Sequence, residues 1–369
     1  MKITFPHMGN LFIPLKVLFD ILEIDYAVPS LSRCKFEEGI AHSPEFACLP
    51  FKITLGDLLD GIEQGADHIL YGGGCGQCRF GYYADLHEAI LKSAGYDVTM
   101  IRLDSSNMTF QELMGKLKPF TEGKSKARLV RGILSAVNTV LMADRLSKTA
   151  AWIRCREQQK GDTDKVMRRF NQRIIKAKGY KEIKQLIHSA RKQLRSIPVD
   201  LEFKPLKVAI VGEIYTSIDP FVNMEMESKL GSLGVEVHNH LTISSWVIDH
   251  GIKKVLPLKL KNKAHERGKE LFDTDDIGGH GLQTVGNAIL SAQKGFDGVI
   301  HTYPFTCLPE IVAQCSFGEI QDQYGIPIMT LIIDELTGKA GYETRIEAFV
   351  DMLERRRQLE LQKTMREAF

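Results

Sequence analysis

Short apolar runs alternate with amphipathic helical patterns in two separate stretches of the 369-residue chain. The runs cover residues 2–6, 25–29, 67–73 and 97–103 in the first stretch, and 206–215, 235–240, 296–303 and 326–334 in the second. Strand–helix–strand alternation is typical of parallel sheets, whose strands are joined by right-handed crossovers. The sequence therefore predicts an α/β protein with two Rossmann-like or flavodoxin-like parallel-sheet domains.

A segment of different character separates the two stretches. Residues 117–196 have long helical periodicity and almost no strand pattern. Sixteen Lys or Arg residues and only four Asp or Glu residues occur from Arg145 to Arg195. We therefore predict a first α/β domain at 1–115, a basic helical segment at 116–204, a second α/β domain at 205–340 and a C-terminal helix at 341–369.

The basic segment has two interpretations. A charged run is usually a solvated helical face, but this excess of one sign also suits docking of an acidic partner or a phosphorylated ligand. The sequence disfavours nucleic acid, because it contains neither a pattern of interleaved stacking aromatics nor a zinc-finger or RRM motif.

The composition indicates a globular protein of a reducing compartment. The chain is 44% hydrophobic and 25% charged and has no run of 18 apolar residues, so we expect a cytoplasmic protein without a membrane span. Pro6, His7 and Asn10 interrupt the apolar start, which predicts a strand and a helix rather than a signal peptide. Seven cysteines is an odd number, and thiols kept for metal binding or catalysis fit it better than disulfides.

Four cysteines have similar positions in the predicted topology. Cys75 and Cys78 lie between a strand and the next helix, Cys307 has the same position in the second α/β domain, and Cys48 directly precedes a helix. Ligands of open α/β sheets bind outside the carboxyl ends of the strands, and helix N-termini favour thiolates. We therefore predict that these four cysteines meet in a cleft between the two domains.

Three chemistries remain open for this set. A redox dithiol explains Cys75 and Cys78 alone, and a structural zinc site usually has two C-x-x-C knuckles, of which the chain has one. An iron–sulfur cluster accommodates all four cysteines and is favoured, because Gly74 and Gly76 let backbone N–H groups approach sulfides closely. Three other cysteines remain: we expect Cys155 to lie in the core or on the surface rather than act as a ligand, we expect Cys315 to pack, and Cys34 is ambiguous.

Other polar residues follow strands or precede helices and are candidates for acid–base or binding roles. Glu213 ends a strand and is a candidate proton donor, with helix capping or a salt bridge as the alternative. His280, in a glycine-flanked loop, and His7, after the first strand, are further catalytic candidates, and either is also consistent with a turn or core position. Arg79 follows Cys78 and is a candidate for stabilising an anionic cluster or substrate.

Several segments together resemble one known family. These segments are SPEFACLPFKITLG, GGCGQCRFGYY, VGEIYTSIDPFVN, IGGHG and YPFTCLPEIVA with the following IPIMTLIIDELTGKAGYETRIEAF. The chain is similar, over nearly its whole length outside the basic segment, to the short, activase-associated branch of the 2-hydroxyacyl-CoA dehydratase and benzoyl-CoA reductase superfamily. The matching cysteines are Cys48, Cys75, Cys78 and Cys307.

This resemblance implies an oxygen-sensitive [4Fe-4S] cluster, an anaerobic redox function and a separate ATP-hydrolysing activase that donates electrons. It also implies assembly with a like or related subunit, and one branch of the superfamily holds a double-cubane [8Fe-9S] cluster instead. No phosphate loop of the G-x-x-x-x-G-K-[ST] type occurs in the chain. Two hypotheses follow: a redox protein that reduces a small or CoA-linked substrate or relays electrons, and a non-catalytic partner subunit that carries a cluster or another metal.

Overall fold

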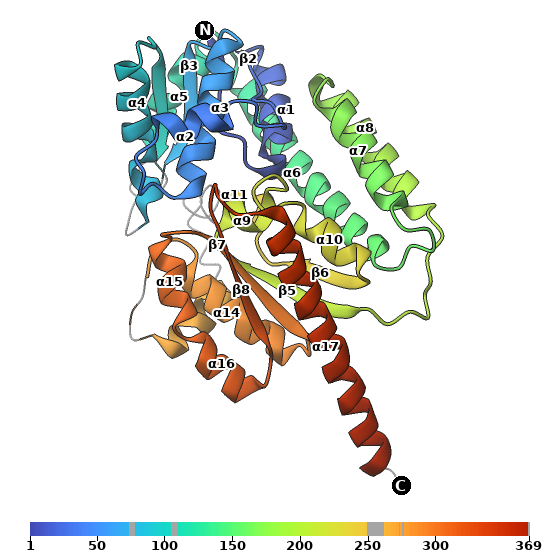
Figure 1. Cartoon of the computed structure of the whole chain (residues 1–369). Coiled ribbons are helices and arrows are strands. Elements are labelled where there is room, and N and C mark those ends of the chain that lie inside the picture. Colours follow the sequence, from blue (N-terminus) through green and yellow to red (C-terminus); the bar gives the residue numbers. More distant parts are fainter. Residues whose placement is uncertain (74–77, 105–109, 249–261, 273, 275–276, 368–369) are drawn as a thin grey trace. The chain divides into compact units, whose positions relative to one another are not determined.

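The computed structural model describes residues 1–73, 78–104, 110–248, 262–272, 274 and 277–367 (Figure 1). The chain forms two compact units, each with its own four-stranded parallel sheet. The first unit comprises Met1–Ser147, Arg168–Lys192 and Thr242–Leu260, and the second comprises Lys148–Met167, Gln193–Leu241 and Lys261–Phe369. The predicted α/β class with two parallel-sheet domains is confirmed.

The sheet of the first unit has the order β2-β1-β3-β4, and all its pairings are parallel. Its strands are β1 (Lys2–Thr4), β2 (Asp25–Tyr26), β3 (His68–Gly73) and β4 (Thr99–Asp104). The pairing of β3 with β4 extends from His68 opposite Thr99 to Gly73 opposite Asp104. This is the flavodoxin-like order, in which the chain reverses direction across the sheet between β1 and β3.

Helices cover both faces of the first sheet. They are η1 (Gly9–Leu11), α1 (Phe12–Leu22), α2 (Phe36–His42), α3 (Leu49–Glu63), η2 (Arg79–Tyr82), α4 (Tyr83–Ser93), α5 (Phe110–Thr121) and α11 (Ile243–Val247). Right-handed crossovers place α3 and α4 on one face and α1 on the other. Residues 49–61 of α3 are all buried, and the helix packs with β3 and α4 in one apolar cluster that includes Leu55, Ile69 and Leu91.

The second sheet repeats the same order, β6-β5-β7-β8, again with parallel pairings. Its strands are β5 (Leu206–Gly212), β6 (Val235–Asn239), β7 (Gly298–Pro304) and β8 (Ile328–Ile333). Its helices are α9 (Ile214–Ile218), α10 (Met226–Ser232), α13 (Lys263–Gly268), η4 (Lys269–Leu271), α14 (Gly281–Gln293), α15 (Leu308–Gln314), α16 (Phe317–Tyr324) and α17 (Lys339–Glu367).

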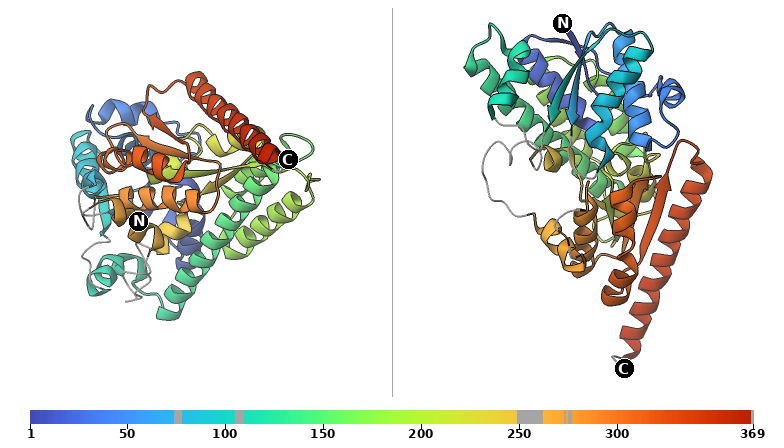
Figure 2. Two further views of the ribbon diagram at one scale, coloured as in Figure 1. Left: turned by 90° about the horizontal axis from the view of Figure 1, so that it is seen from below. Right: turned by 90° about the vertical axis from the view of Figure 1, so that its left-hand side faces the viewer.

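Two layers of helices enclose the second sheet. Helices α14, α15 and α16 pack on one face through an apolar cluster that includes Val211, Val285 and Val299. The amino-terminal half of α17 covers the other face, where Leu353 packs against Gly298 at the start of β7. Figures 1 and 2 show that the last turns of α17 run clear of this sheet.

The predicted basic segment is helical, as expected from its periodicity. It forms α6 (Lys126–Arg154), α7 (Asp162–Ile174) and α8 (Gly179–Arg195). Three of the five boundaries between the two units fall within these helices. In the part of the chain that the structure describes, no helix combines the length and apolarity that a membrane crossing requires.

One predicted helix is wrong in its extent. The sequence pattern indicates a single helix over 309–325, whereas α15 ends at Gln314 and α16 begins at Phe317. The Cys315 thiol contacts the Ile311 carbonyl at 3.4 Å, and the Ser316 hydroxyl donates to the Ala313 carbonyl at 2.8 Å. These local contacts satisfy carbonyls at the end of α15, so the chain can turn and bury Phe317.

Candidate functional site

The first candidate region is the carboxyl edge of the first sheet, where β1 and β3 lie side by side. The chain leaves β1 towards β2 and leaves β3 towards β4, so the two connections diverge at this edge. Open α/β sheets bind ligands at such a switch point. His7 follows β1 here and Cys78 follows β3, and Cys48 begins α3 at the same edge because α3 runs antiparallel to β3, which it precedes.

Cys48 is the N-cap of α3, and Pro50 lies in the first turn of this helix. The Sγ atom of the half-buried Cys48 is hydrogen-bonded to the hydroxyl group of Tyr83. The Tyr83 ring packs edge-on against Phe51, with ring centroids 5.1 Å apart, which holds the hydroxyl at the start of α3. The partial positive charge at the amino-terminal end of this 15-residue helix favours a thiolate at this position.

Cys78 is the N-cap of the short helix η2, which leads directly into α4. Arg79 donates a hydrogen bond from Nη1 to the carbonyl oxygen of Phe46 at 2.8 Å. This bond joins the segment that carries Cys78 to the segment that precedes Cys48. Together with the Tyr83 contact, it places these two predicted ligands at one edge of one sheet.

The third predicted ligand of this unit, Cys75, lies outside the described residues, as do Gly74 and Gly76. Among the residues that the structure does describe, no three or more His, Cys, Asp or Glu side chains form a group that could hold a metal ion. Of the predicted ligands in the first unit, the structure therefore describes Cys48 and Cys78.

A buried histidine, which the sequence did not single out, lies beneath Cys48. His87 of α4 stacks on Phe51 with ring centroids 4.1 Å apart, and its Nε2 atom contacts the Phe51 carbonyl at 3.1 Å. Burial lowers the pKa of His87 to about 3, so its imidazole is neutral at physiological pH. The Tyr83 ring that contacts Cys48 also packs on His87, with centroids 5.8 Å apart.

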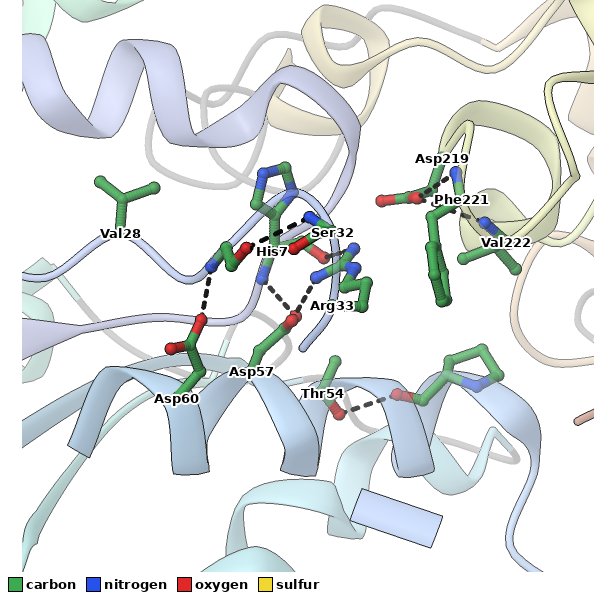
Figure 3. A network of polar contacts seen from close by, with 12 residues as sticks. His7, Val28, Ser32, Arg33, Thr54, Asp57, Asp60, Asp219, Phe221 and Val222 are labelled. Atoms are coloured by element: carbon green, nitrogen blue, oxygen red, sulfur yellow. Dashed lines mark hydrogen bonds and ion pairs between the residues drawn. The ribbon is translucent and has the colours of Figure 1, made fainter. Parts of the chain in front are cut away.

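His7 is held by a buried polar network rather than exposed at the sheet edge (Figure 3). Its backbone N–H donates to Asp57 Oδ2 at 2.8 Å, and its carbonyl oxygen accepts from Arg33 Nη2 at 3.0 Å. Arg33 also pairs with Asp57, and both of these side chains are 2% exposed. The His7 ring packs against Phe12, with centroids 5.0 Å apart.

Helix α3 therefore connects two parts of this edge. Its first residue follows Cys48, and Asp57, in its third turn, fixes the loop after β1 that carries His7. Because α3 is buried along most of its length, the positions of Cys48 and of the His7 backbone are set by the same rigid element. The buried helix therefore holds both parts of this edge in fixed positions.

The second candidate region is the corresponding edge of the second sheet, between β5 and β7. Gly212 ends β5 with φ +134°, and a Cβ atom there would lie 1.9 Å from the Thr302 carbonyl oxygen. The Glu213 N–H donates to that oxygen at 3.0 Å. The Glu213 carboxylate caps α9 by accepting from the Thr216 N–H at 3.1 Å, so the capping interpretation of this residue is confirmed.

The acid–base interpretation of Glu213 remains open alongside capping. Burial, with a smaller contribution from the Glu310 carboxylate, raises the pKa of Glu213 to about 7. A carboxyl group with this pKa is about half protonated at neutral pH, the range that suits a proton donor or acceptor.

Cys307 begins α15 at this edge, as Cys48 begins α3 in the first unit, and Pro309 lies in its first turn. The first turn of α15 also carries Glu310, which points into the unit and is 1% exposed. Its Oε2 atom lies 3.0 Å from Nε2 of His301 on β7, and its Oε1 atom accepts from the Thr284 hydroxyl at 3.2 Å. The His301 side chain is fully buried.

His280 is the N-cap of α14 and is half-buried. Helix α14 precedes β7, so its amino-terminal end lies at the same carboxyl edge as Cys307. The neighbouring Gly281 packs closely on α15, because a Cβ atom there would lie 2.8 Å from the Pro309 carbonyl oxygen. The second edge thus carries Glu213, Cys307 and His280, each at the start of a helix of the same unit.

The Glu213 pKa predicts a specific pH dependence of stability. The pKa rises from 4.5 to about 7, so between these values the folded chain holds a proton that the unfolded chain has released. The Glu213 contribution to the free energy of unfolding is therefore complete below pH 4.5 and is lost as the pH rises through about 7. Glu213→Gln replaces the titrating carboxyl group with an amide that does not titrate. In urea unfolding, the free energy of unfolding should therefore fall less between about pH 5 and about pH 7.5 in this variant than in the wild type.

Glu319→Gln is the matched control, because Glu319 is exposed on α16 of the same unit. This variant should follow the wild-type pH dependence. If Glu213→Gln also follows it, Glu213 does not hold a proton in the folded protein near neutral pH.

The three remaining cysteines have separate surroundings. Cys155 is buried near the end of α6, where its thiol contacts the Trp152 carbonyl at 3.3 Å and accepts from Arg156 at 3.2 Å. Of the two predicted locations, core and surface, the structure shows the core. Cys34 and Cys315 are exposed. The predicted packing of Cys315 is therefore wrong, because α15 ends at Gln314 and Cys315 lies in the turn that follows it.

Two sequence features point to the buried pair of His301 and Glu310, which was not predicted. His301 is a polar residue within β7, whose seven residues are all buried, and a buried polar side chain requires a partner. That partner, Glu310, stands three residues after Cys307, directly after the Leu-Pro pair that follows this cysteine. Arg33 and Asp57 carried no comparable local signal, because their pairing depends on how α3 packs beneath the loop that carries Arg33.

Comparison with known proteins gives no family for the chain. No protein-family model matches it, and no curated protein matches it.

Proposed function

We propose that the chain is an iron–sulfur redox protein that binds a [4Fe-4S] cluster through Cys48, Cys75, Cys78 and Cys307. In this proposal a separate ATP-hydrolysing activase supplies low-potential electrons, as the sequence resemblance implies. The chain then reduces a small or CoA-linked substrate or passes the electrons on.

One observation carries the proposal: cysteines begin helices at the carboxyl edges of both sheets. Cys48 and Cys78 begin α3 and η2 at the first edge, and Cys307 begins α15 at the second. Cysteine thiolates are the usual ligands of such clusters, and a cubane takes four of them. The donor set therefore fits the proposed group, with Cys75 and its neighbouring glycines contributing from residues 74–77.

The surrounding residues support thiolate chemistry at the first edge. The Tyr83 hydroxyl is hydrogen-bonded to Cys48 Sγ, and hydrogen bonds to ligand sulfurs are one means by which proteins set cluster potentials. Arg79, exposed beside Cys78, places a positive charge next to the proposed anionic group. When bound, such a cluster supplies one-electron transfer at low potential.

Three residues are proposed to handle protons if the chain acts on a substrate. Glu213 is the first, because its pKa of about 7 allows it both to give and to accept a proton. His280 lies at the same sheet edge, at the start of α14. His7 belongs to the first edge, and its ring is buried, so it is the least accessible of the three.

Metal content tests the proposal directly. The chain is purified anaerobically, and iron, acid-labile sulfide and zinc are counted per chain. We expect about four iron and four sulfide and a visible absorption band that bleaches on reduction. Each single serine substitution, at Cys48, Cys75, Cys78 or Cys307, should remove most of the iron.

Cys34→Ser and Cys315→Ser are the matched controls, because both thiols are exposed and neither belongs to the proposed set. Unchanged iron in these two variants supports a single cubane, whereas loss of about half of the iron at either position favours the double-cubane [8Fe-9S] alternative. Zinc without sulfide contradicts the proposal in favour of a zinc site. Metal-free protein with a titratable Cys75–Cys78 pair contradicts it in favour of a dithiol.

The alternative, from a different functional class, is a non-catalytic subunit that carries a cluster or another metal for a related enzyme. Both versions predict the same cysteine phenotypes. They differ in turnover, because only the reductase consumes a substrate when it is supplied with activase and ATP. In that assay, Glu213→Gln should lower turnover and leave the iron content unchanged.

A further inference from the structure

An exposed apolar face on the first turns of α6 is the starting observation. Gly132 faces inwards, where a Cβ atom would lie 3.0 Å from Leu18 of α1. The outward side chains are apolar: Val130 is 54% exposed, Ile133 44% and Leu134 64%. Large apolar side chains grouped on one helix face mark an interaction surface more often than scattered ones do.

The same face forms one wall of a shallow hollow of about 580 Å³. Lys126, Val130, Arg131 and Leu134 line it from α6, and Tyr180 lines it from the start of α8. The Tyr180 hydroxyl accepts a hydrogen bond from Asn138 of α6 at 2.7 Å, which fixes the second wall to the first. From Lys126 to Leu134 the hollow follows α6 for about 12 Å, the length of two helical turns.

The rim of the hollow is basic. Lys126 and Arg131 belong to its lining, and Lys184 stands 5.7 Å above the Tyr180 ring. The adjacent part of α7 and α8 in the same unit, from Arg168 to Lys192, contains nine Lys or Arg residues and a single acidic residue, Glu182. Eight of those nine are exposed: Arg168, Arg169, Arg173, Lys176, Lys178, Lys181, Lys184 and Lys192.

We propose that this surface docks an amphipathic helix of a partner protein, with apolar residues at its centre and acidic residues on its flanks. The apolar wall that α6 forms matches the apolar stripe of such a helix. The hollow is two helical turns long, which suits anchor residues at i, i+3 or i+4, and i+7. The basic rim attracts the acidic flanks and fixes their orientation. This inference does not depend on the proposed cluster.

The exposed apolar face of α6 distinguishes this surface from one that binds nucleic acid. Phosphate contacts need Lys and Arg, and bases need polar or stacking partners, so exposed Val130, Ile133 and Leu134 contribute little to either. An amphipathic helix with acidic flanks can contact both the apolar face of α6 and the basic rim.

The test uses the full chain and a fluorescein-labelled synthetic helix of about four turns, with Leu at i, i+3, i+4 and i+7 and Glu on both flanks. Fluorescence anisotropy should show saturable binding that weakens strongly between low and physiological salt. Leu134→Glu and Arg131→Glu should each weaken binding about tenfold or more, since one removes an anchor and the other reverses a rim charge.

Lys363→Glu is the charge-matched control, because it makes the same reversal at an exposed position of α17. It should leave the peptide affinity within about twofold of the wild type. The inference is overturned if the helix does not bind, if a version with Lys in place of Glu binds equally well, or if Leu134→Glu binds like the wild type. Competition by duplex DNA at equal or higher affinity overturns it in favour of a nucleic-acid surface. Iron counts of the same variants should be unchanged, which separates this result from the fate of the cluster proposal.

Discussion

Asp57→Ala should lower the free energy of unfolding of the first unit by about 3–5 kcal/mol. The variant removes the carboxylate that pairs with Arg33, and the guanidinium is then left charged at a site where it is 2% exposed. The same change removes the acceptor of the His7 N–H, so the loop after β1 should loosen. The two tryptophans make this measurable, because Trp246 belongs to the first unit and Trp152 to the second.

The experiment is urea unfolding in a Trp152→Phe background, in which Trp246 fluorescence reports on the first unit alone. Arg33→Met combined with Asp57→Leu should recover much of the loss, because an apolar pair of similar volume avoids burying a charge. Glu38→Ala removes one partner of the exposed Lys35 ion pair and should change little. A loss for Asp57→Ala as small as that for Glu38→Ala would mean that the buried pair does not stabilise this edge.

Gly212→Ala should lower the free energy of unfolding of the second unit by about 3 kcal/mol or more. The backbone at φ +134° excludes most side chains, and the new Cβ atom would overlap the Thr302 carbonyl oxygen. Relief requires β5 and β7 to separate at their carboxyl ends, where the Glu213 N–H bonds to that oxygen. The variant should therefore also disturb the Glu213 cap of α9.

Urea unfolding in a Trp246→Phe background reports this loss through Trp152 of the second unit. Gly318→Ala is the control, because nothing lies within 4 Å of a Cβ atom at that position of α16. It should stabilise the unit slightly, by about 0.5–1 kcal/mol, as Ala is the better helix former. Equal effects of the two substitutions would contradict the close approach of β5 and β7 at Gly212.

The fold and the positions of the cysteines were accessible to sequence reasoning because both depend on local patterns. Alternating apolar and helical periods determine the order of elements, and parallel connectivity then assigns each strand end to one edge. Cys48 and Cys307 each precede Leu-Pro, and a proline in the first turn is a strong signal for a helix start. Both cysteines are N-caps, as that signal predicts.

Side-chain partners were less accessible, because they depend on register and packing. The His301–Glu310 pair forms only because His301 lies on the face of β7 that α15 covers, and because Glu310 lies on the inward face of α15. The Arg33–Asp57 pair joins residues of two elements whose packing no short segment specifies. The break between α15 and α16 was not predicted for a related reason. The local sequence favours a continuous helix, but burying Phe317 stabilises a turn between the two helices.

The division of the chain into two units has a consequence for how the protein is made. The polypeptide passes between the units five times, so neither unit is a contiguous piece of sequence. A ribosome must synthesise residues up to 260 before the first unit has all its parts, although its four strands are complete by Asp104. By then, β5 and β6 of the second sheet have been synthesised but lack their neighbours β7 and β8. The strands of the first sheet are therefore complete long before those of the second, which needs β8 at Ile328–Ile333, and no single cut in the gene yields either unit alone.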